Sequence, residues 1–407
     1  TLLQVVWLCW VSVGPHSRDF RTHLRLGFLL QLSLFSKPRP PPKKITLLVI
    51  LVGWVLGESV YGMLTQIFAV GLDGLITVVS TLVLQTLIPV AFLVLWERRV
   101  LASVQRRQGP NAIGLFGLLQ PVADGVKLML KEGIMPRFAS RALYLVAPLL
   151  SLIIAFTCWL ILPLSFSAFV FDSDISLIIF LAFSSVSVYG LVLAGWASYS
   201  RYAFMGALRA IAQLVSYEVV LTLTLFPVVL YSGSFSFLAI VHVQSESCWF
   251  LFPCLPAAMM FYIIVLAETN RTPFDLPEAE AELVSGFNVE YSSIMFALFF
   301  LAEYSNMMLM SALFSILFLG GWAEGTLLFV LKIVVMTYSL IAVRALVPRY
   351  RYDQLMFLCW RTFLPLSLGF YVFVLGVCVA LDAAPYNAEL LFNVWVGETR
   401  GWVSTYL

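Results

Sequence analysis

The chain has 407 residues, of which 61% are hydrophobic and only 11% are charged, and its mean hydropathy is +0.96. Soluble domains are close to half apolar and a quarter charged, so this composition excludes an ordinary soluble domain. Several apolar runs reach about 20 residues, the length that crosses a bilayer as a helix. The alternating segments of about 10 residues that build membrane barrels are not seen. We therefore predict an all-α polytopic membrane protein.

Residue types that hold redox groups are sparse. The six cysteines form no C-x-x-C pair, and the three histidines lie outside the predicted spans. This argues against an iron–sulfur cluster, a disulfide framework or a membrane haem. No glycine-rich nucleotide motif is present either. We expect no metal and no cofactor bound by this chain, so that any redox cofactors would belong to partner subunits.

The first 72 residues read as an N-terminal extension. A basic, proline-rich linker occupies 37–44, and the following stretch 45–70 is long enough to form a ninth span. Glu58 near the middle of that stretch would cost about 2.5–3.5 kcal/mol in a membrane. The arginine-containing, acid-poor start resembles a targeting segment.

Eight spans are predicted in a membrane domain over 73–382, which a C-terminal tail over 383–407 follows. They lie at roughly 75–96, 143–165, 175–197, 211–231, 249–267, 291–318, 326–346 and 362–381. Four alternate connections carry 15 Lys and Arg, whereas the opposite connections carry none and the tail carries only Arg400. The positive-inside rule places the basic connections on the cytoplasmic or matrix side.

Two basic regions lie on that side. Residues 97–111 contain Glu97-Arg98-Arg99 and Gln105-Arg106-Arg107, and residues 348–355 alternate cations with aromatics. The first region fits either a positive-inside stop signal at the lipid headgroups or an electropositive mouth that receives a polar headgroup or a partner protein. The second fits either an interfacial aromatic belt or a surface for a quinone ring and a docking subunit.

An amphipathic helix is predicted to begin near Pro121 and to run to Lys131. Its polar positions step by four, three and four residues, at Gln120, Asp124, Lys127 and Lys131. Apolar residues fill the other face. We expect this helix to lie in the interface plane. A plain surface helix is the alternative, although Asp124 beside Lys127 could serve as a site carboxylate.

Charges inside predicted spans are expensive and usually face a partner or a wet path. Glu218, Glu303 and Lys332 occupy such positions. Either these groups take part in function, or they are paired structurally, Lys332 with a glutamate.

An acidic stretch over 268–290 holds six carboxylates against one cation, Arg271. The six are Glu268, Asp275, Glu278, Glu280, Glu282 and Glu290. Clustered carboxylates repel, so some should hold protons near neutral pH, which predicts proton handling. The alternative is a solvated helix capped by Asp275 and Glu278.

The motifs are similar to those of the subunit 1 family of respiratory NADH dehydrogenase, complex I. The resemblance rests on ERR from 97, QRRQGPN from 105, GLLQPVADGVK from 117, AETNRTPFDLPEAEAELV from 267, FALFFLAEY from 296 and RYRYDQLM from 349. It covers about 75–382. It implies a core membrane subunit with eight spans, which forms the membrane part of a ubiquinone chamber and couples quinone reduction to proton translocation.

The resemblance also implies residue roles. Quinone-binding residues would be Arg98, Arg107, Asp124, Arg271, Phe296, Arg349, Arg351 and Asp353. The proton path would comprise Glu218, Glu268, Asp275, Glu278, Glu280, Glu282, Glu290, Glu303 and Lys332. No residue of this chain is expected to be catalytic by itself.

The implied substrate is ubiquinone, with NADH, FMN and iron–sulfur clusters held by partner subunits. Implied partners are the peripheral-arm quinone-site and iron–sulfur subunits, small membrane subunits and phospholipids, with no nucleic acid. The mitochondrial inner membrane is the expected location. Three alternatives stay open: a quinone-independent subunit of a hydrogenase-type complex, a stand-alone ion-coupled transporter, and a structural anchor.

Overall fold

A computed structural model describes residues 86–114, 117–165, 173–276 and 286–380. Every described residue belongs to one compact unit within Ile67–Leu407. The predicted N-terminal extension, with its linker and ninth span, and the C-terminal tail lie outside the described residues. So do Glu278, Glu280 and Glu282 of the acidic stretch.

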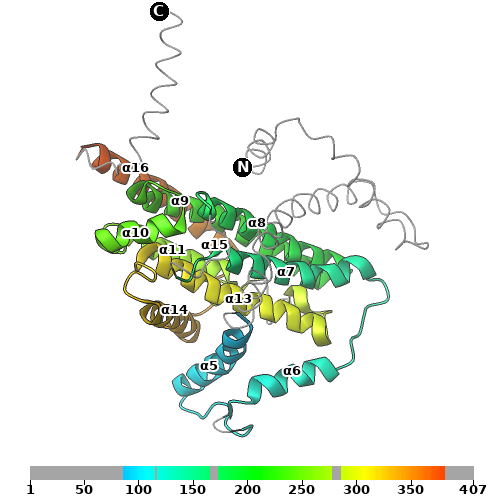
Figure 1. Cartoon of the computed structure of the whole chain (residues 1–407). Helices are drawn as coiled ribbons and strands as arrows, with labels where there is room; N and C mark the ends of the chain where they lie inside the picture. Colours follow the sequence, from blue (N-terminus) through cyan, green and yellow to red (C-terminus); the bar gives the residue numbers. More distant parts are fainter. Residues whose placement is uncertain (1–85, 115–116, 166–172, 277–285, 381–407) are drawn as a thin grey trace, which may run out of the picture. The chain divides into compact units, whose positions relative to one another are not determined.

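The described residues are helical and contain no strand (Figure 1). The elements are α5 (Ile88–Val104), α6 (Gln120–Leu130), α7 (Arg141–Ile161), α8 (Ser176–Ala197), α9 (Arg201–Ser232), α10 (Phe237–Glu246), α11 (Leu255–Glu268), η3 (Gly286–Asn288), α13 (Ser293–Phe318), α14 (Thr326–Leu346), α15 (Tyr352–Phe357), η4 (Leu358–Phe363) and α16 (Leu364–Ala380). The all-helical fold class is therefore confirmed for these residues.

Six helices are long and apolar enough to cross a membrane. They are Arg141–Ile161, Ser176–Ala197, Arg201–Ser232, Ser293–Phe318, Thr326–Leu346 and the continuous helix Tyr352–Ala380. The predicted span at 249–267 contains the shorter 14-residue helix α11, and the one at 75–96 is described only from residue 86 onward. The chain is a multi-pass helical membrane protein, whereas the count of eight spans stays a prediction.

Two helices begin well before the spans predicted within them. Helix α9 begins at Arg201 rather than near 211, and the last span begins at Tyr352 rather than near 362. At 32 residues, α9 is about 48 Å long by helical rise, so it extends beyond the ~30 Å apolar layer. The added turns carry charged residues, Arg201 and Arg209 in α9 and Asp353 and Arg361 in the last helix, which is why both stretches were read as connections. Helix α10 was not predicted, because its 10 residues are too few to cross a membrane.

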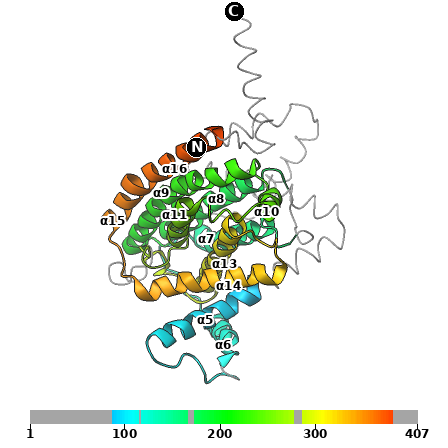
Figure 2. The ribbon, with the colours of Figure 1, turned by 90° about the vertical axis from the view of Figure 1, so that its left-hand side faces the viewer.

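The core forms where α7, α8, α9, α11 and α13 pack together (Figure 1). Small residues allow the close approach of α8 and α9, since a Cβ added at Gly195 would lie 2.3 Å from the Ala207 Cβ. Packing through small residues is usual between membrane helices. In Figure 2, α16 runs along α9 and α14 crosses next to α5, in agreement with the contacts between these pairs.

Helix α6 begins at Gln120 and ends at Leu130, where the amphipathic helix was predicted, and its place in the membrane interface stays a prediction. None of its residues is buried, and Val122, Met129 and Leu130 expose 62%, 71% and 83% of their surface. An apolar face left uncovered by the described part of the chain is consistent with a helix lying in the membrane interface.

Candidate functional site

A buried ion cluster lies where α5, α13 and the segment after α11 meet. The guanidinium of Arg271 approaches Glu97 Oε1 at 3.4 Å through Nη1 and Glu303 Oε1 at 3.2 Å through Nε. The side chains of Arg271 and Glu97 are only 8% and 4% exposed. Charges taken this far from water are stabilised only when they are paired.

Two further side chains complete the cluster. Arg344 at the end of α14 pairs with the same Glu97 Oε1, and the Tyr304 ring lies 4.4 Å from the Arg271 guanidinium carbon. Two carboxylates thus face two guanidinium groups. Burial lowers the pKa of Arg271, but the carboxylates of Glu303 and Glu97 raise it by more, so the guanidinium stays charged. Any change of charge on Glu97 or Glu303 would upset this balance.

A cavity of about 60 Å³ adjoins the cluster, and its walls combine polar side chains with the apolar Leu191, Leu214, Phe287, Phe299 and Ala302. A water molecule needs roughly 10–15 Å³ of such space, so the cavity has room for several. Glu268 and Glu303 both line it, together with the polar side chains of Ser151, Ser187, Thr269, Asn270 and Asn306. Carboxylates from α11 and α13 therefore open onto one space suited to ordered water.

Glu218 extends this set toward α8. It lies half-buried on α9, is hydrogen-bonded to Ser185, and interacts electrostatically with Glu268. The structure therefore brings Glu218, Glu268 and Glu303 into one region, as expected if they share a task.

Asp275 opens the second feature of the site. Its carboxylate Oδ2 lies 2.9 Å from Arg349 Nη2. Further contacts join the loop after α11 to the loop after α14. The Tyr350 N–H donates to the Pro273 carbonyl at 3.1 Å, and the Tyr350 ring stacks on Phe274 at 5.6 Å. Burial raises the pKa of Asp275 to about 6, although Arg349 opposes that rise. The start of the acidic stretch is thus fastened to the basic loop after α14.

A third pairing joins α5 to α6. Arg98 Nη1 donates to Asp124 Oδ2 at 2.8 Å, and Gln120 Nε2 donates to Asp124 Oδ1 at 2.9 Å. Both members of this ion pair are partly exposed, at 49% and 34%. These two predicted quinone-site residues lie together, and solvent or a ligand reaches them.

The remaining predicted residues are more scattered. Phe296 on α13 is half-buried and lies 4.5 Å from the Phe300 ring, and Glu290 is half-buried with its carbonyl accepting from Tyr144 at 2.7 Å. Three others are exposed: Arg107, Arg351 and Asp353.

Lys332 lies apart from the buried cluster. Its ammonium donates to the Leu319 carbonyl at 2.6 Å and pairs with Glu324 at 3.2 Å. Leu319 follows α13, about 24 Å along the helix from Glu303 by helical rise. The interpretation that Lys332 pairs with a glutamate is therefore confirmed, while its proton role stays a prediction.

Glu97, Arg344 and Tyr304 were absent from the predicted site residues. Glu97 carried a usable signal, because an acid directly follows an apolar run and precedes two arginines. Its partner Arg271 lies 174 residues away and Arg344 lies 247 residues away, so the pairing itself left no local trace.

The fold and site define a polytopic helical membrane protein with paired charges and a cavity inside its bundle. A profile of the NADH dehydrogenase family matches residues 76–375, and the chain belongs to this family. It is 49% identical over 318 residues to NADH-ubiquinone oxidoreductase chain 1 of Chondrus crispus, an alignment covering 75% of this chain and 97% of the relative.

Plant and bacterial relatives are equally similar. The chain 1 protein of Arabidopsis thaliana is 50% identical over 315 residues, covering 75% of this chain and 97% of the relative. An NADH-quinone oxidoreductase subunit of Rhodospirillum rubrum is 49% identical over 315 residues, covering 75% of this chain and 94% of the relative.

Proposed function

We propose that this chain is a core membrane subunit of a proton-pumping NADH:ubiquinone oxidoreductase. Membership of the NADH dehydrogenase family and the names of its relatives support a place in an oxidoreductase complex. The chain would form the membrane part of the ubiquinone chamber, and it would couple quinone reduction to proton translocation. The relatives from a red alga and a plant support the mitochondrial inner membrane as its location.

The proposed quinone-binding residues fall into three groups. The exposed Arg98–Asp124 pair supplies a charged edge between α5 and α6, where a polar quinone headgroup could be met. Phe296 adds an aromatic wall on α13, and Arg271 adds buried positive charge. Arg107, Arg349, Arg351 and Asp353 would border the entrance and the contact with the peripheral arm.

The proposed proton path begins at the acidic stretch and enters the bundle. The observation that carries it is the cavity that Glu268 and Glu303 share and that adjoins the Arg271 cluster. Glu218 would continue the path along α9. The roles of Asp275, Glu278, Glu280, Glu282, Glu290 and Lys332 rest on the family resemblance and on their charge.

Coupling would follow from electrostatics. Reduction of the quinone draws protons or shifts charge in the chamber. Arg271 is held by Glu97 on one side and Glu303 on the other, so a new negative charge nearby would weaken one of these pairs. A Glu303 carboxylate released from Arg271 would take up a proton more readily. The cavity water would then relay protons toward Glu268.

The chain would hold no redox cofactor of its own. Ubiquinone would be its substrate, while NADH, FMN and iron–sulfur clusters would be bound by partner subunits. The proposed partners are the peripheral quinone-site and iron–sulfur subunits, small membrane subunits and phospholipids.

Replacing Glu303 by glutamine tests the proposal. Glu303→Gln keeps the shape of the side chain but removes its charge and its proton. We expect NADH:ubiquinone reductase activity or coupled proton pumping to fall on the order of tenfold or more in the assembled complex, as for the loss of a proton-transfer group.

Glu246→Gln provides the matched control, because Glu246 is an exposed carboxylate on α10 that pairs with His242 at 3.6 Å. It should leave both activities unchanged. Normal coupled activity in Glu303→Gln, with the complex intact, would overturn the proposal.

A further inference from the structure

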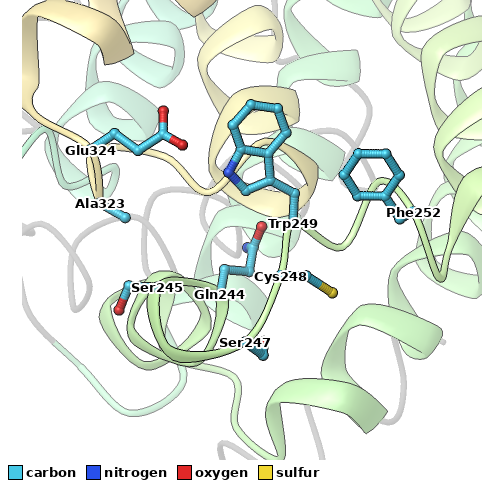
Figure 3. A pocket seen from close by; sticks show the side chains of 8 residues that line it. All are labelled: Gln244, Ser245, Ser247, Cys248, Trp249, Phe252, Ala323 and Glu324. Atoms are coloured by element: carbon cyan, nitrogen blue, oxygen red, sulfur yellow. The ribbon is translucent and has the colours of Figure 1, made fainter.

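A pocket of about 510 Å³ lies far from the buried ion cluster, between the end of α10 and the turn that joins α13 to α14 (Figure 3). Its volume falls within the range of small-ligand sites. Glu324 stands on one wall, and Trp249 and Phe252 stand on the other. Nothing in the proposed quinone and proton functions uses this pocket.

The walls of this pocket already bind one ammonium group. Lys332 Nζ lies 3.2 Å from Glu324 Oε2 and 4.8 Å from the Trp249 ring centroid. Its side chain is 11% exposed, whereas that of Glu324 is 42% exposed. A second ammonium group that enters from outside can therefore reach the Glu324 carboxylate, while the Lys332 ammonium stays largely covered.

The aromatic wall suits a cation. Trp249 and Phe252 stack with their ring centroids 6.4 Å apart and an interplanar angle of 14°. Phe252 is 71% exposed. A carboxylate beside aromatic faces is the arrangement that recognises alkylammonium groups. The Glu324–Lys332 pair offers both signs of charge, which complements a zwitterion better than an anion.

The surroundings of the pocket favour a lipid over a soluble amine. Phe252, in the turn before α11, is 71% exposed, and Leu255 and Met259, four residues apart on one face of α11, are 46% and 62% exposed. This apolar stripe leads from the pocket wall along α11. The connections 232–248 and 319–325 contain no Lys or Arg to attract an anionic headgroup.

We propose that this pocket binds the ammonium end of a zwitterionic phospholipid headgroup, with an acyl chain lying along Phe252, Leu255 and Met259. Glu324 and the Trp249–Phe252 pair contact the ammonium. The inference stands apart from the quinone proposal, because it uses none of the same residues except Lys332, which holds Glu324 in place.

Photolabelling of the purified complex tests the site. The complex is reconstituted in dioleoylphosphatidylcholine vesicles with a trace of phosphatidylcholine bearing a diazirine on one acyl chain. Labelling of the 249–259 peptide is then measured by mass spectrometry. We expect it to fall roughly fivefold in Glu324→Gln and in Trp249→Leu, the factor that about 1 kcal/mol represents. Phosphatidylethanolamine should compete with the probe, and phosphatidylglycerol should not.

Two variants keep the test decisive. Glu246→Gln removes a nearby exposed carboxylate that does not line the pocket, so labelling should stay unchanged. Trp249→Tyr keeps an aromatic face and should restore most of the labelling lost in Trp249→Leu, which separates recognition from a fault in folding. Equal competition by phosphatidylglycerol, or equal labelling in Trp249→Leu and Trp249→Tyr, would overturn the proposal.

Discussion

At the residue scale, the decisive feature is a guanidinium group shared by two buried carboxylates. Arg271 stood out in the sequence as the single cation of the acidic stretch. The structure pairs it with Glu97 and Glu303, from α5 and α13. This arginine therefore joins distant helices in the core.

Removing this guanidinium should destabilise the chain. Arg271→Met would leave Glu97 and Glu303 buried with less compensating charge, and breaking a buried pair in this way costs about 3–5 kcal/mol. We expect a lower thermal unfolding midpoint and less assembled complex on native gels. Arg201→Met is the control, because Arg201 is exposed at the start of α9 and belongs to none of the proposed sites. Equal effects of the two changes would contradict the prediction.

Asp275 should make stability depend on pH. Burial raises its pKa from 3.8 to about 6, so between these values the folded state binds more protons than the unfolded state. Its contribution to stability is therefore complete below pH 3.8 and is lost as the pH rises through 6. Asp275→Asn should flatten this part of the profile, measured as the difference in thermal midpoint from the unaltered complex between about pH 4.5 and 7. If the difference in thermal midpoint between Asp275→Asn and the unaltered complex does not change with pH over that range, the raised pKa of Asp275 is contradicted.

At the element scale, helix lengths and contacts follow different rules. Hydropathy located the apolar centres of α7, α8, α13 and α14 closely, because the cost of placing polar groups in lipid acts on each segment separately. It did not reveal that α9 begins at Arg201 and the last helix at Tyr352, ten residues before the spans predicted there. Backbone hydrogen bonding stabilises those extra turns without an apolar run to reveal them.

The contact of α8 with α9 provides a test of packing. Gly195→Ala would bring a methyl group within 2.3 Å of the Ala207 Cβ, and overpacking of this kind costs about 1–3 kcal/mol. We expect a lower unfolding midpoint for the purified complex. Gly369→Ala on α16 should be close to neutral, since no described atom lies within 4 Å of the added Cβ. Equal falls in the unfolding midpoint of both variants would contradict the prediction that the contact with Ala207 causes the loss.

At the scale of the whole molecule, sidedness is the main prediction. The basic connections and the Asp275–Arg349 pair should face one side of the membrane, and the pocket beside Trp249 should face the other. The family relationship supports this arrangement, because the proposed quinone site would then lie next to the peripheral arm.

Thiol labelling in sealed vesicles checks this sidedness. Cys248 is exposed on the turn after α10, and Gln108→Cys would place a second thiol in the connection after α5. A membrane-impermeant maleimide should label Cys248 in vesicles of one orientation and the residue 108 thiol in vesicles of the other, as identified by peptide mass spectrometry. Labelling of both from the same side would refute the predicted topology.

The sequence by itself determined the class of protein, the predicted sidedness and the residues to inspect. These properties depend on local composition, because each span must meet the solvation cost of lipid by itself. Its motifs also pointed to the family that the comparisons confirm.

Only the tertiary structure decided which charges meet. Glu97 and Arg344 approach from positions 247 residues apart in the chain, and Glu268 and Glu303 share a cavity between helices. Such pairings depend on how whole helices pack, and no local pattern encodes them. Lys332 shows the same point: its charge inside a span predicted either a proton path or a glutamate partner, and packing shows that the partner is Glu324.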